Sequence, residues 1–351
     1  MDKKLNKGTK KYKISFLFLL IIAAVTFCVI FREFNLNDII NEILSSSHKP
    51  YLIVACLMSI FYLMLYGKFV EIGTRAYGER ISHFRSFIYG CADFFYSAIT
   101  PSASGGQPVV IFLMAKDGLS YSTSVITVIL QTISFKFVLL FYNILSLFFV
   151  WSIITTINSI FIIFLIIGTV VSIAGIILCF TSMYRTEITG VCGRAIINFL
   201  VRIRIIRHKQ EKLAHFEKTL SEYKEAAINL KGKKYMLFKM FIVTFLQRTV
   251  MFSIAYFVYR SFGLNDFNII QFFCIQASVS LAVDSIPLPG SMGANEYATY
   301  LLYGHIYGTN NNMSAAAMLL TRGFSYYFTL LVSGIFILSK HIFDVRKVKR
   351  I

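Results

Sequence analysis

Two short stretches decide the fold of this chain: PSASGGQ at residues 101–107 and PGSMGAN at residues 289–295. In both, a proline is followed by three mostly small residues, a glycine, a second tiny residue and a side-chain amide. Each stretch interrupts a long apolar segment, where proline and glycine prevent a continuous membrane helix. Broken helices at corresponding positions in two halves of a membrane protein indicate the binding site of a transporter.

The composition is that of an integral membrane protein. The 351 residues are 56% hydrophobic and 16% aromatic, and the mean hydropathy is +0.67. One soluble core cannot bury so much apolar surface, and several windows exceed the roughly 18 apolar residues that indicate a membrane span. We expect full spans at residues 14–31, 51–70, 121–151, 159–180, 235–262 and 315–338. The first resembles a signal peptide, but no small-residue cleavage site follows it, so we expect it to be retained.

Two further apolar stretches, at residues 86–115 and 268–307, contain the broken motifs. We predict that each is a re-entrant hairpin whose loop is buried in protein or faces an aqueous cavity. Each half then has the order span, span, hairpin, span, with three full crossings, so the second half is inverted relative to the first. The predicted fold class is an all-α polytopic membrane protein of two inverted repeats: residues 1–151, and residues 152–351 with a basic cytoplasmic connector at 182–234.

The formal net charge of +18 supports this topology. The basic residues lie at the ends of apolar segments, which indicates orientation signals and contacts with anionic lipid rather than nucleic-acid binding. The N-terminus, residues 68–85, residues 185–234 and the C-terminal tail are rich in lysine and arginine, whereas residues 32–49 and 309–314 are not. We therefore expect a protein of the bacterial cytoplasmic membrane with both termini in the cytoplasm. Treating either hairpin as a full span would place later basic segments outside.

The connector has two interpretations. Ile196, Leu200, Ile203 and Ile206 recur among arginines, which predicts helices lying on the membrane surface. Residues 211–234 fit a solvated charged hairpin equally well.

The two motifs supply candidate ligands for a lipid headgroup. Helices that restart near Gly106 and near Gly293 would present unpaired N–H groups and a positive dipole end to phosphate, and Gln107 and Asn295 could hydrogen-bond hydroxyls. The alternative is that both loops are only tight structural turns. The candidate substrate-binding residues of the motifs are Pro101, Ser104, Gly105, Gly106, Gln107, Pro289, Gly293 and Asn295.

Three cations, Lys136, Arg248 and Arg322, lie well inside predicted spans, where a charge costs several kcal/mol unless it meets a partner or a wet cavity. We list them as substrate-binding candidates that hold a translocating phosphate. The alternatives are snorkelling to an interface or ion pairs with Asp93, Asp284 or Glu296. Asp284 and Glu296 flank the second motif. Either could couple proton movement, anchor Arg322 or cap a half-helix.

Other chemistry has no support in the sequence. The six cysteines form no C-x-x-C pair and the six histidines have no metal-ligand spacing, so we expect no metal site and no cofactor. No paired catalytic carboxylates and no nucleophile beside a histidine base are recognisable, so we expect no catalytic residues.

The motifs resemble those of the bacterial lysylphosphatidylglycerol synthase/flippase family, in its membrane domain. The matching segments are residues 100–108, 116–120, 287–296 and 315–323, and the resemblance extends over about residues 14–338. It implies a flippase fold with phosphatidylglycerol derivatives or glycolipids as substrates. The third span of the family often carries an acidic–basic pair where this chain has Gln131 and Thr132. Bifunctional members also carry a C-terminal aminoacyltransferase domain; because the sequence ends about a dozen residues after the last predicted span, we expect no such domain here.

The sequence therefore favours a lipid flippase that moves an anionic or phosphate-bearing lipid, possible substrates being phosphatidylglycerol and lysylphosphatidylglycerol. We expect no enzyme activity. The alternatives are a lipid-modifying transferase (lysylphosphatidylglycerol synthesis, with resistance to cationic peptides) and a membrane scaffold for a partner enzyme. A homodimer and a separate lipid-modifying enzyme remain open as partners.

Overall fold

The structure, a computed structural model, describes residues 36–44, 48–157, 159–185, 209–284, 286–308 and 311–348, and single positions between 187 and 198. The predicted span at 14–31 lies outside the described residues, as do the four apolar connector positions, Ile196 to Ile206. Within the described part every regular element is helical.

Five stretches are long and apolar enough to cross a membrane, so the chain is a multi-pass membrane protein. They are α3 (Pro50–Arg75), α6 (Tyr121–Phe149), α8 (Ser159–Tyr184), α11 (Lys234–Ser261) and Asn311–Lys340, which comprises α14 (Asn311–Arg322), η4 (Gly323–Phe328) and most of α15 (Thr329–Val348). They coincide with five of the six predicted spans. The η4 segment is a π-helix, which the apolar pattern did not predict.

The two broken motifs divide helices where the prolines and glycines predict. The first comprises α4 (His83–Ala98), the 3₁₀ turn η1 (Pro101–Ala103) and α5 (Gly106–Lys116); the second comprises α12 (Ile269–Val283), η3 (Pro289–Ser291) and α13 (Ala294–Ile306). The predicted helix restarts, at Gly106 and directly after Gly293, are confirmed.

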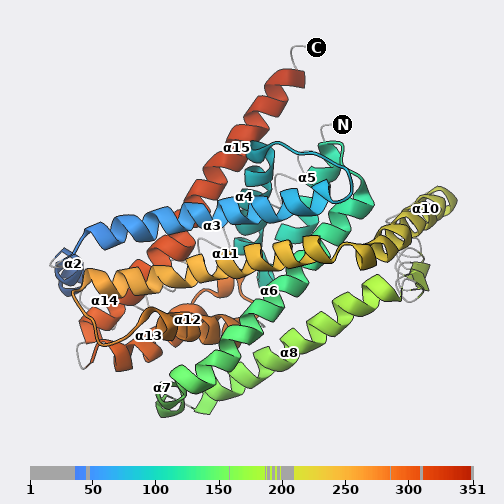
Figure 1. Cartoon of the computed structure of the whole chain (residues 1–351). Helices are drawn as coiled ribbons and strands as arrows, with labels where there is room; N and C mark the ends of the chain where they lie inside the picture. Colours follow the sequence, from blue (N-terminus) through green and yellow to red (C-terminus); the bar gives the residue numbers. More distant parts are fainter. Residues whose placement is uncertain are drawn as a thin grey trace.

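The spans pack into one bundle. Helices α3 and α11 lie side by side along most of their length (Figure 1). Helix α8 contacts α6 and α12 through a buried stripe of Phe161, Leu165, Gly168, Ser172 and Ile176, while many of its other apolar side chains are exposed. A Cβ atom on Gly168 would lie 1.9 Å from the Leu281 carbonyl oxygen. Only glycine therefore allows α8 to approach α12 so closely.

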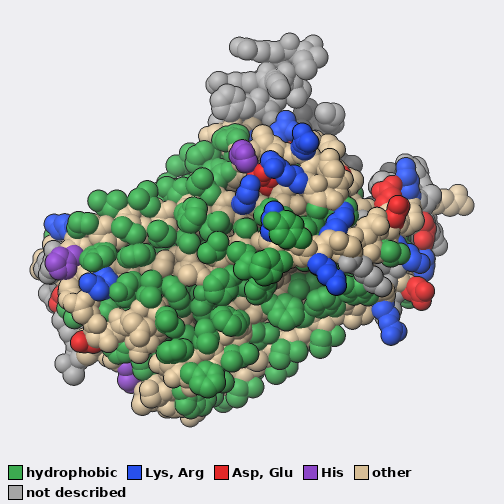
Figure 2. All heavy atoms as spheres, in the orientation of Figure 1, with side chains coloured by type: hydrophobic (Ala, Val, Ile, Leu, Met, Phe, Trp, Pro, Cys, Tyr) green, Lys and Arg blue, Asp and Glu red, His purple; other side chains and the backbone are tan. Residues whose placement is uncertain are grey.

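Basic segments gather at one end of the bundle. The Lys233 ammonium donates to the Ala76 carbonyl (2.5 Å), and the Lys340 ammonium pairs with Asp117 (3.0 Å). Figure 2 shows basic side chains concentrated at this end and an apolar surface over the middle of the bundle. Four segments that are far apart in the sequence thus meet at one end of the bundle. The charge distribution predicts that these segments lie on the same side of the membrane.

The two broken pairs open at opposite ends of the bundle. The first pair begins and ends at the basic end, where the Ser120 N–H donates to Glu79 Oε1 (3.1 Å). Both ends of the second pair meet Tyr259 near the other end of α11: its hydroxyl accepts from the Asp266 N–H (2.9 Å), and its ring centroid lies 5.5 Å from that of Tyr307. These contacts place the start and the end of each pair near one another.

The connector contributes a docked helix. Helix α10 (Lys209–Ile228) is followed by the short η2 (Asn229–Gly232), and Tyr223, Ala227 and Leu230 bury against α6 and neighbouring helices at the basic end. Residues 209–228 thus form one helix rather than a charged hairpin. Short helices α2 (Leu36–Leu44) and α7 (Trp151–Thr156) lie at the opposite end.

Candidate functional site

The two broken loops meet inside the bundle, where η1 contacts η3 and α4. Their backbones have the same conformation in the turn that starts at the proline and diverge after it, where ψ is −15° at Ser104 and 144° at Met292. After each proline come two residues in the left-handed region, Ser102 and Ala103 with φ of 51° and 52°, and Gly290 and Ser291 with φ of 57° and 50°. In both turns the second residue after the proline donates its N–H to the carbonyl before the proline, and the third donates to the proline carbonyl, at 3.1 to 3.3 Å. Pro101-Ser102-Ala103 and Pro289-Gly290-Ser291 therefore form the same main-chain turn.

A buried ion pair supports the second loop. Arg322 Nε donates to Glu296 Oε1 at 2.8 Å, and one terminal nitrogen of Arg322 donates to the Gly290 carbonyl at 3.2 Å. The other carboxylate oxygen of Glu296 accepts the Gly293 N–H at 2.7 Å, which caps the start of α13. Glu296 thus anchors Arg322 and caps the half-helix at once, the two structural roles expected for it.

Tyr326 joins the two loops. Its hydroxyl donates to the Ala98 carbonyl at the end of α4 (3.1 Å), and the Arg322 guanidinium lies 4.4 Å from its ring centroid. A Cβ atom on Gly290 would lie 2.2 Å from the Tyr326 hydroxyl oxygen, so this position requires glycine for space, and its positive φ also favours glycine. Tyr326 lies in the π-helical segment, and its role was not predicted from the sequence.

The first loop is more open than the second. Pro101 and Ser104 are exposed, while Gly106 is buried. The Gly105 N–H donates to the Thr100 hydroxyl (2.8 Å), and the Gln107 amide donates to the Thr132 hydroxyl on α6 (2.8 Å). The Gln107 amide therefore has a partner within the protein. On the second motif, the Asn295 side-chain oxygen accepts from Thr299 at 3.4 Å, and Pro289 is buried.

Lys136 on α6 also has a carboxylate partner. Its ammonium pairs with Asp284 at the end of α12, and the two side chains are 13% and 25% exposed. This contact ties the first half of the chain to the second broken motif. The third candidate cation, Arg248, has different neighbours from Lys136 and Arg322.

Arg248 on α11 lies between aromatic rings, with its guanidinium carbon 4.1 Å from the Phe135 ring centroid and 5.4 Å from that of Tyr62. Its buried Nε makes no hydrogen bond. Among the described residues Arg248 forms no ion pair, although the buried carboxylate of Asp93 lies close enough to interact with its charge. Arg248 is therefore a cation within a membrane-spanning helix that has no direct ion-pair partner among the described residues.

One chain of rings connects the three cations. Arg248 contacts Tyr62, whose ring lies 6.0 Å from that of Phe94, and Phe94 lies 6.2 Å from Tyr326, on which Arg322 rests. On its other side Arg248 contacts Phe135, whose ring centroid is 5.7 Å from the Lys136 ammonium. The structure thus brings the candidate cations and both loops into one region. Sequence reasoning missed these rings because the chain has too many aromatic residues for any to be singled out.

No group of histidine, cysteine, aspartate and glutamate with the arrangement of a metal site occurs among the described residues.

A family model described as "Lysylphosphatidylglycerol synthase TM region" matches residues 15–333 of the chain. The chain is also 24% identical over 293 residues to a "UPF0104 membrane protein" from Archaeoglobus fulgidus, a match that covers 83% of this chain and 87% of that protein.

Proposed function

The chain belongs to the family of lysylphosphatidylglycerol synthase TM regions, and from this premise we propose that it moves an anionic or phosphate-bearing phospholipid between membrane leaflets. Phosphatidylglycerol and lysylphosphatidylglycerol are the substrates we propose first. In this proposal the two broken pairs are re-entrant hairpins of two inverted repeats in the cytoplasmic membrane, with both chain termini in the cytoplasm. The lipid leaves chemically unchanged, so the protein acts as a transporter and not as an enzyme.

The observation that carries the proposal is the charge of Arg248. A guanidinium inside a membrane span costs several kcal/mol when no carboxylate pairs with it directly, and a lipid phosphate that arrives there reduces this cost. A guanidinium also binds phosphate through two parallel hydrogen bonds. Lys136 and Arg322 already have carboxylate partners. We therefore assign the first phosphate contact to Arg248. In this proposal, Lys136 and Arg322 contact the phosphate only in states in which their own ion pairs are broken.

The surroundings of the loops support a lipid rather than a soluble substrate. The helix starts at Gly106 and Ala294 supply N–H groups that have no acceptor within their own helix. An apolar hollow of about 220 Å³ lies between α8 and the second broken pair, lined among others by Phe164, Ile286 and Tyr297. It offers room for part of an acyl chain next to a polar loop, the combination that a phospholipid requires.

The test is transport by purified protein in vesicles. A fluorescent phosphatidylglycerol on the inner leaflet becomes accessible to an impermeant quencher only after it has moved, and mass spectrometry of the recovered lipid shows whether it has changed. We expect Arg248→Gln to abolish movement and Arg248→Lys to slow it, because an ammonium cannot reproduce the paired hydrogen bonds.

The matched control is Arg260→Gln on the same helix, where the guanidinium contacts Tyr51 and Tyr256 near the end of the span. This variant should transport normally. Normal transport by Arg248→Gln would refute the assignment of Arg248. A new lipid species in place of transport would favour the lipid-modifying transferase.

A further inference from the structure

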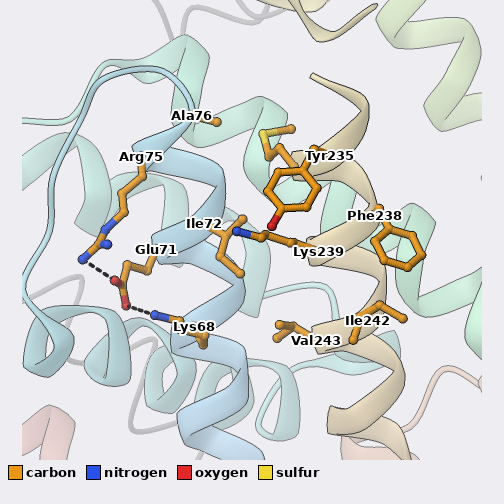
Figure 3. A pocket seen from close by; sticks show the side chains of 11 residues that line it. Lys68, Glu71, Ile72, Arg75, Ala76, Tyr235, Phe238, Lys239, Ile242 and Val243 are labelled. Carbon is orange, nitrogen blue, oxygen red and sulfur yellow. Dashed lines mark hydrogen bonds and ion pairs between the residues drawn. The ribbon is translucent and has the colours of Figure 1, made fainter. Parts of the chain in front are cut away.

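A groove lies on the outside of the bundle at its basic end, between the last turns of α3 and the first turns of α11 (Figure 3). Its volume is about 670 Å³. It is separate from the loops and rings described above. It is lined by Lys68, Glu71, Ile72, Arg75, Ala76, Tyr235, Met236, Phe238, Lys239, Ile242 and Val243.

The α3 side of the groove carries a row of charges centred on one buried carboxylate. Glu71 is 1% exposed; its two oxygens pair with Arg75 (2.5 Å), with Lys68 (3.3 Å) and with His83 (2.9 Å). One carboxylate therefore faces two permanent cations of the groove. Arg75 also lines an adjoining hollow of about 500 Å³ together with Arg80. The α3 rim thus carries excess positive charge.

The α11 side adds an exposed cation that has no acid beside it. The Lys239 ammonium lies 4.2 Å from the ring centroid of Tyr235. Figure 3 shows both side chains in the space between the two helices, with Lys239 extended toward Ile72 on α3. Among the described residues, Lys239 forms no ion pair. The three cations of the lining thus face a single carboxylate.

The remaining lining is apolar and continues into the lipid-facing surface. Phe238 is 62% exposed, and Ile242 and Leu246 follow it along α11 with 38% and 46% exposure. On α3, Met64 is 54% exposed one turn before Lys68. A molecule in this groove therefore meets cations and an aromatic ring at the end of the spans and apolar side chains farther in. Tyrosine and lysine at such a boundary are typical of the membrane–water interface.

We propose that this groove binds one anionic glycerophospholipid, with its phosphate at Lys239 and Tyr235 and one acyl chain along Ile242 and Leu246. The positive lining selects a headgroup with net negative charge, and the apolar continuation selects a lipid over a free phosphate ion. This lipid stays bound on the outside of the bundle and is distinct from the lipid that the central loops move. The bound lipid lies between α3 and α11, the two helices that carry Tyr62 and Arg248.

Tryptophan quenching by brominated lipid tests the groove locally. The chain has one tryptophan, Trp151, so Trp151→Phe with Phe238→Trp places a single reporter at the groove. Trp151→Phe with Leu178→Trp places a comparison reporter on α8, where Leu178 is 70% exposed near the same end of the bundle. Each full-length protein is reconstituted in vesicles of phosphatidylcholine with a minor share of dibrominated phosphatidylglycerol or dibrominated phosphatidylcholine.

We expect the reporter at the groove to prefer phosphatidylglycerol by about fivefold or more, the factor that corresponds to about 1 kcal/mol for one basic residue near the surface. The α8 reporter should show a clearly smaller preference. Lys239→Gln should reduce the preference at the groove by about fivefold, while Lys234→Gln, an exposed lysine of the same helix outside the groove, should leave it unchanged.

Equal preference at the two reporters, or a preference at the groove that survives Lys239→Gln, would overturn the proposal. An equal loss with Lys234→Gln would also overturn it, because general surface charge would then account for the binding. Transport by the central site is measured separately. Its absence would therefore count against the flippase proposal and leave the groove result intact.

Discussion

Replacing Arg322 alone should destabilise the protein far more than replacing Arg322 and Glu296 together. The two side chains are 9% and 3% exposed, and their ion pair is 2.8 Å long. Arg322→Met keeps an unbranched stem but leaves the Glu296 carboxylate buried without its cation, and breaking a buried pair from one side costs about 3–5 kcal/mol. With Glu296→Gln in addition, no unpaired charge remains and the glutamine oxygen can still accept the Gly293 N–H. We expect the double variant to lie within about 2 kcal/mol of the unmodified protein.

The assay is a double-mutant cycle on the purified protein. Unfolding free energies of the four proteins, from titration with denaturing detergent in mixed micelles, give the coupling between the two residues. A double variant as unstable as Arg322→Met would refute the reasoning, because the pair would then not be what neutralises these charges. Transport is measured on the same four samples. Recovery of both stability and transport assigns the pair to the scaffold, whereas stability without transport means that Arg322 also contacts the lipid.

Three further outcomes are expected. Gly168→Leu should lower the thermal unfolding midpoint because its side chain meets the α12 backbone, while Gly175→Leu, with open space around it, should not; equal midpoints would contradict the close packing of α8. Burial raises the pKa of the Tyr77 hydroxyl, beyond the end of α3, to about 12. The neutral, buried tyrosine therefore contributes its full stabilisation to the folded state below pH 10, and this contribution is lost as the pH rises toward 12. Circular dichroism should therefore show less alkaline destabilisation of Tyr77→Phe over that range, and an unchanged profile would contradict it. In a cysteine-free background, Ser104→Cys and Ser291→Cys should label from opposite membrane faces, and labelling from the same face would refute the inverted repeats.

The sequence predicted the helices well because the signals for them are local. Proline and glycine end a helix wherever they stand, so the breaks at 101–107 and 289–295 were readable without any tertiary contact. The spans followed from the length of apolar runs. The π-helical segment was missed, since its widened turn at Gly323–Phe328 leaves no mark in an apolar pattern.

The partners of the three cations could not be predicted, because each contact depends on how distant helices pack. Asp93, Asp284 and Glu296 were all candidates for pairing with these cations. Packing places Glu296 beside Arg322, 26 positions away. It also places Asp284, which flanks the second motif in sequence, beside Lys136, 148 positions away. The aromatic neighbours of Arg248 likewise come from α3 and α6. Sequence reasoning identified the charged residues and left their geometry open.

The common backbone of the two loops also has a consequence for how such a protein can diverge. The first loop holds Ser102 and Ala103 in the left-handed region, where a side chain costs roughly 1–2 kcal/mol per residue, while the second places a glycine at the first of these positions. After a gene duplication, selection on this turn would act on torsion angles and not on residue identity. Within the turns themselves, Pro101-Ser102-Ala103 and Pro289-Gly290-Ser291, only the proline is common to both sequences. A test for internal repeats in this chain should therefore compare backbone angles as well as the sequences.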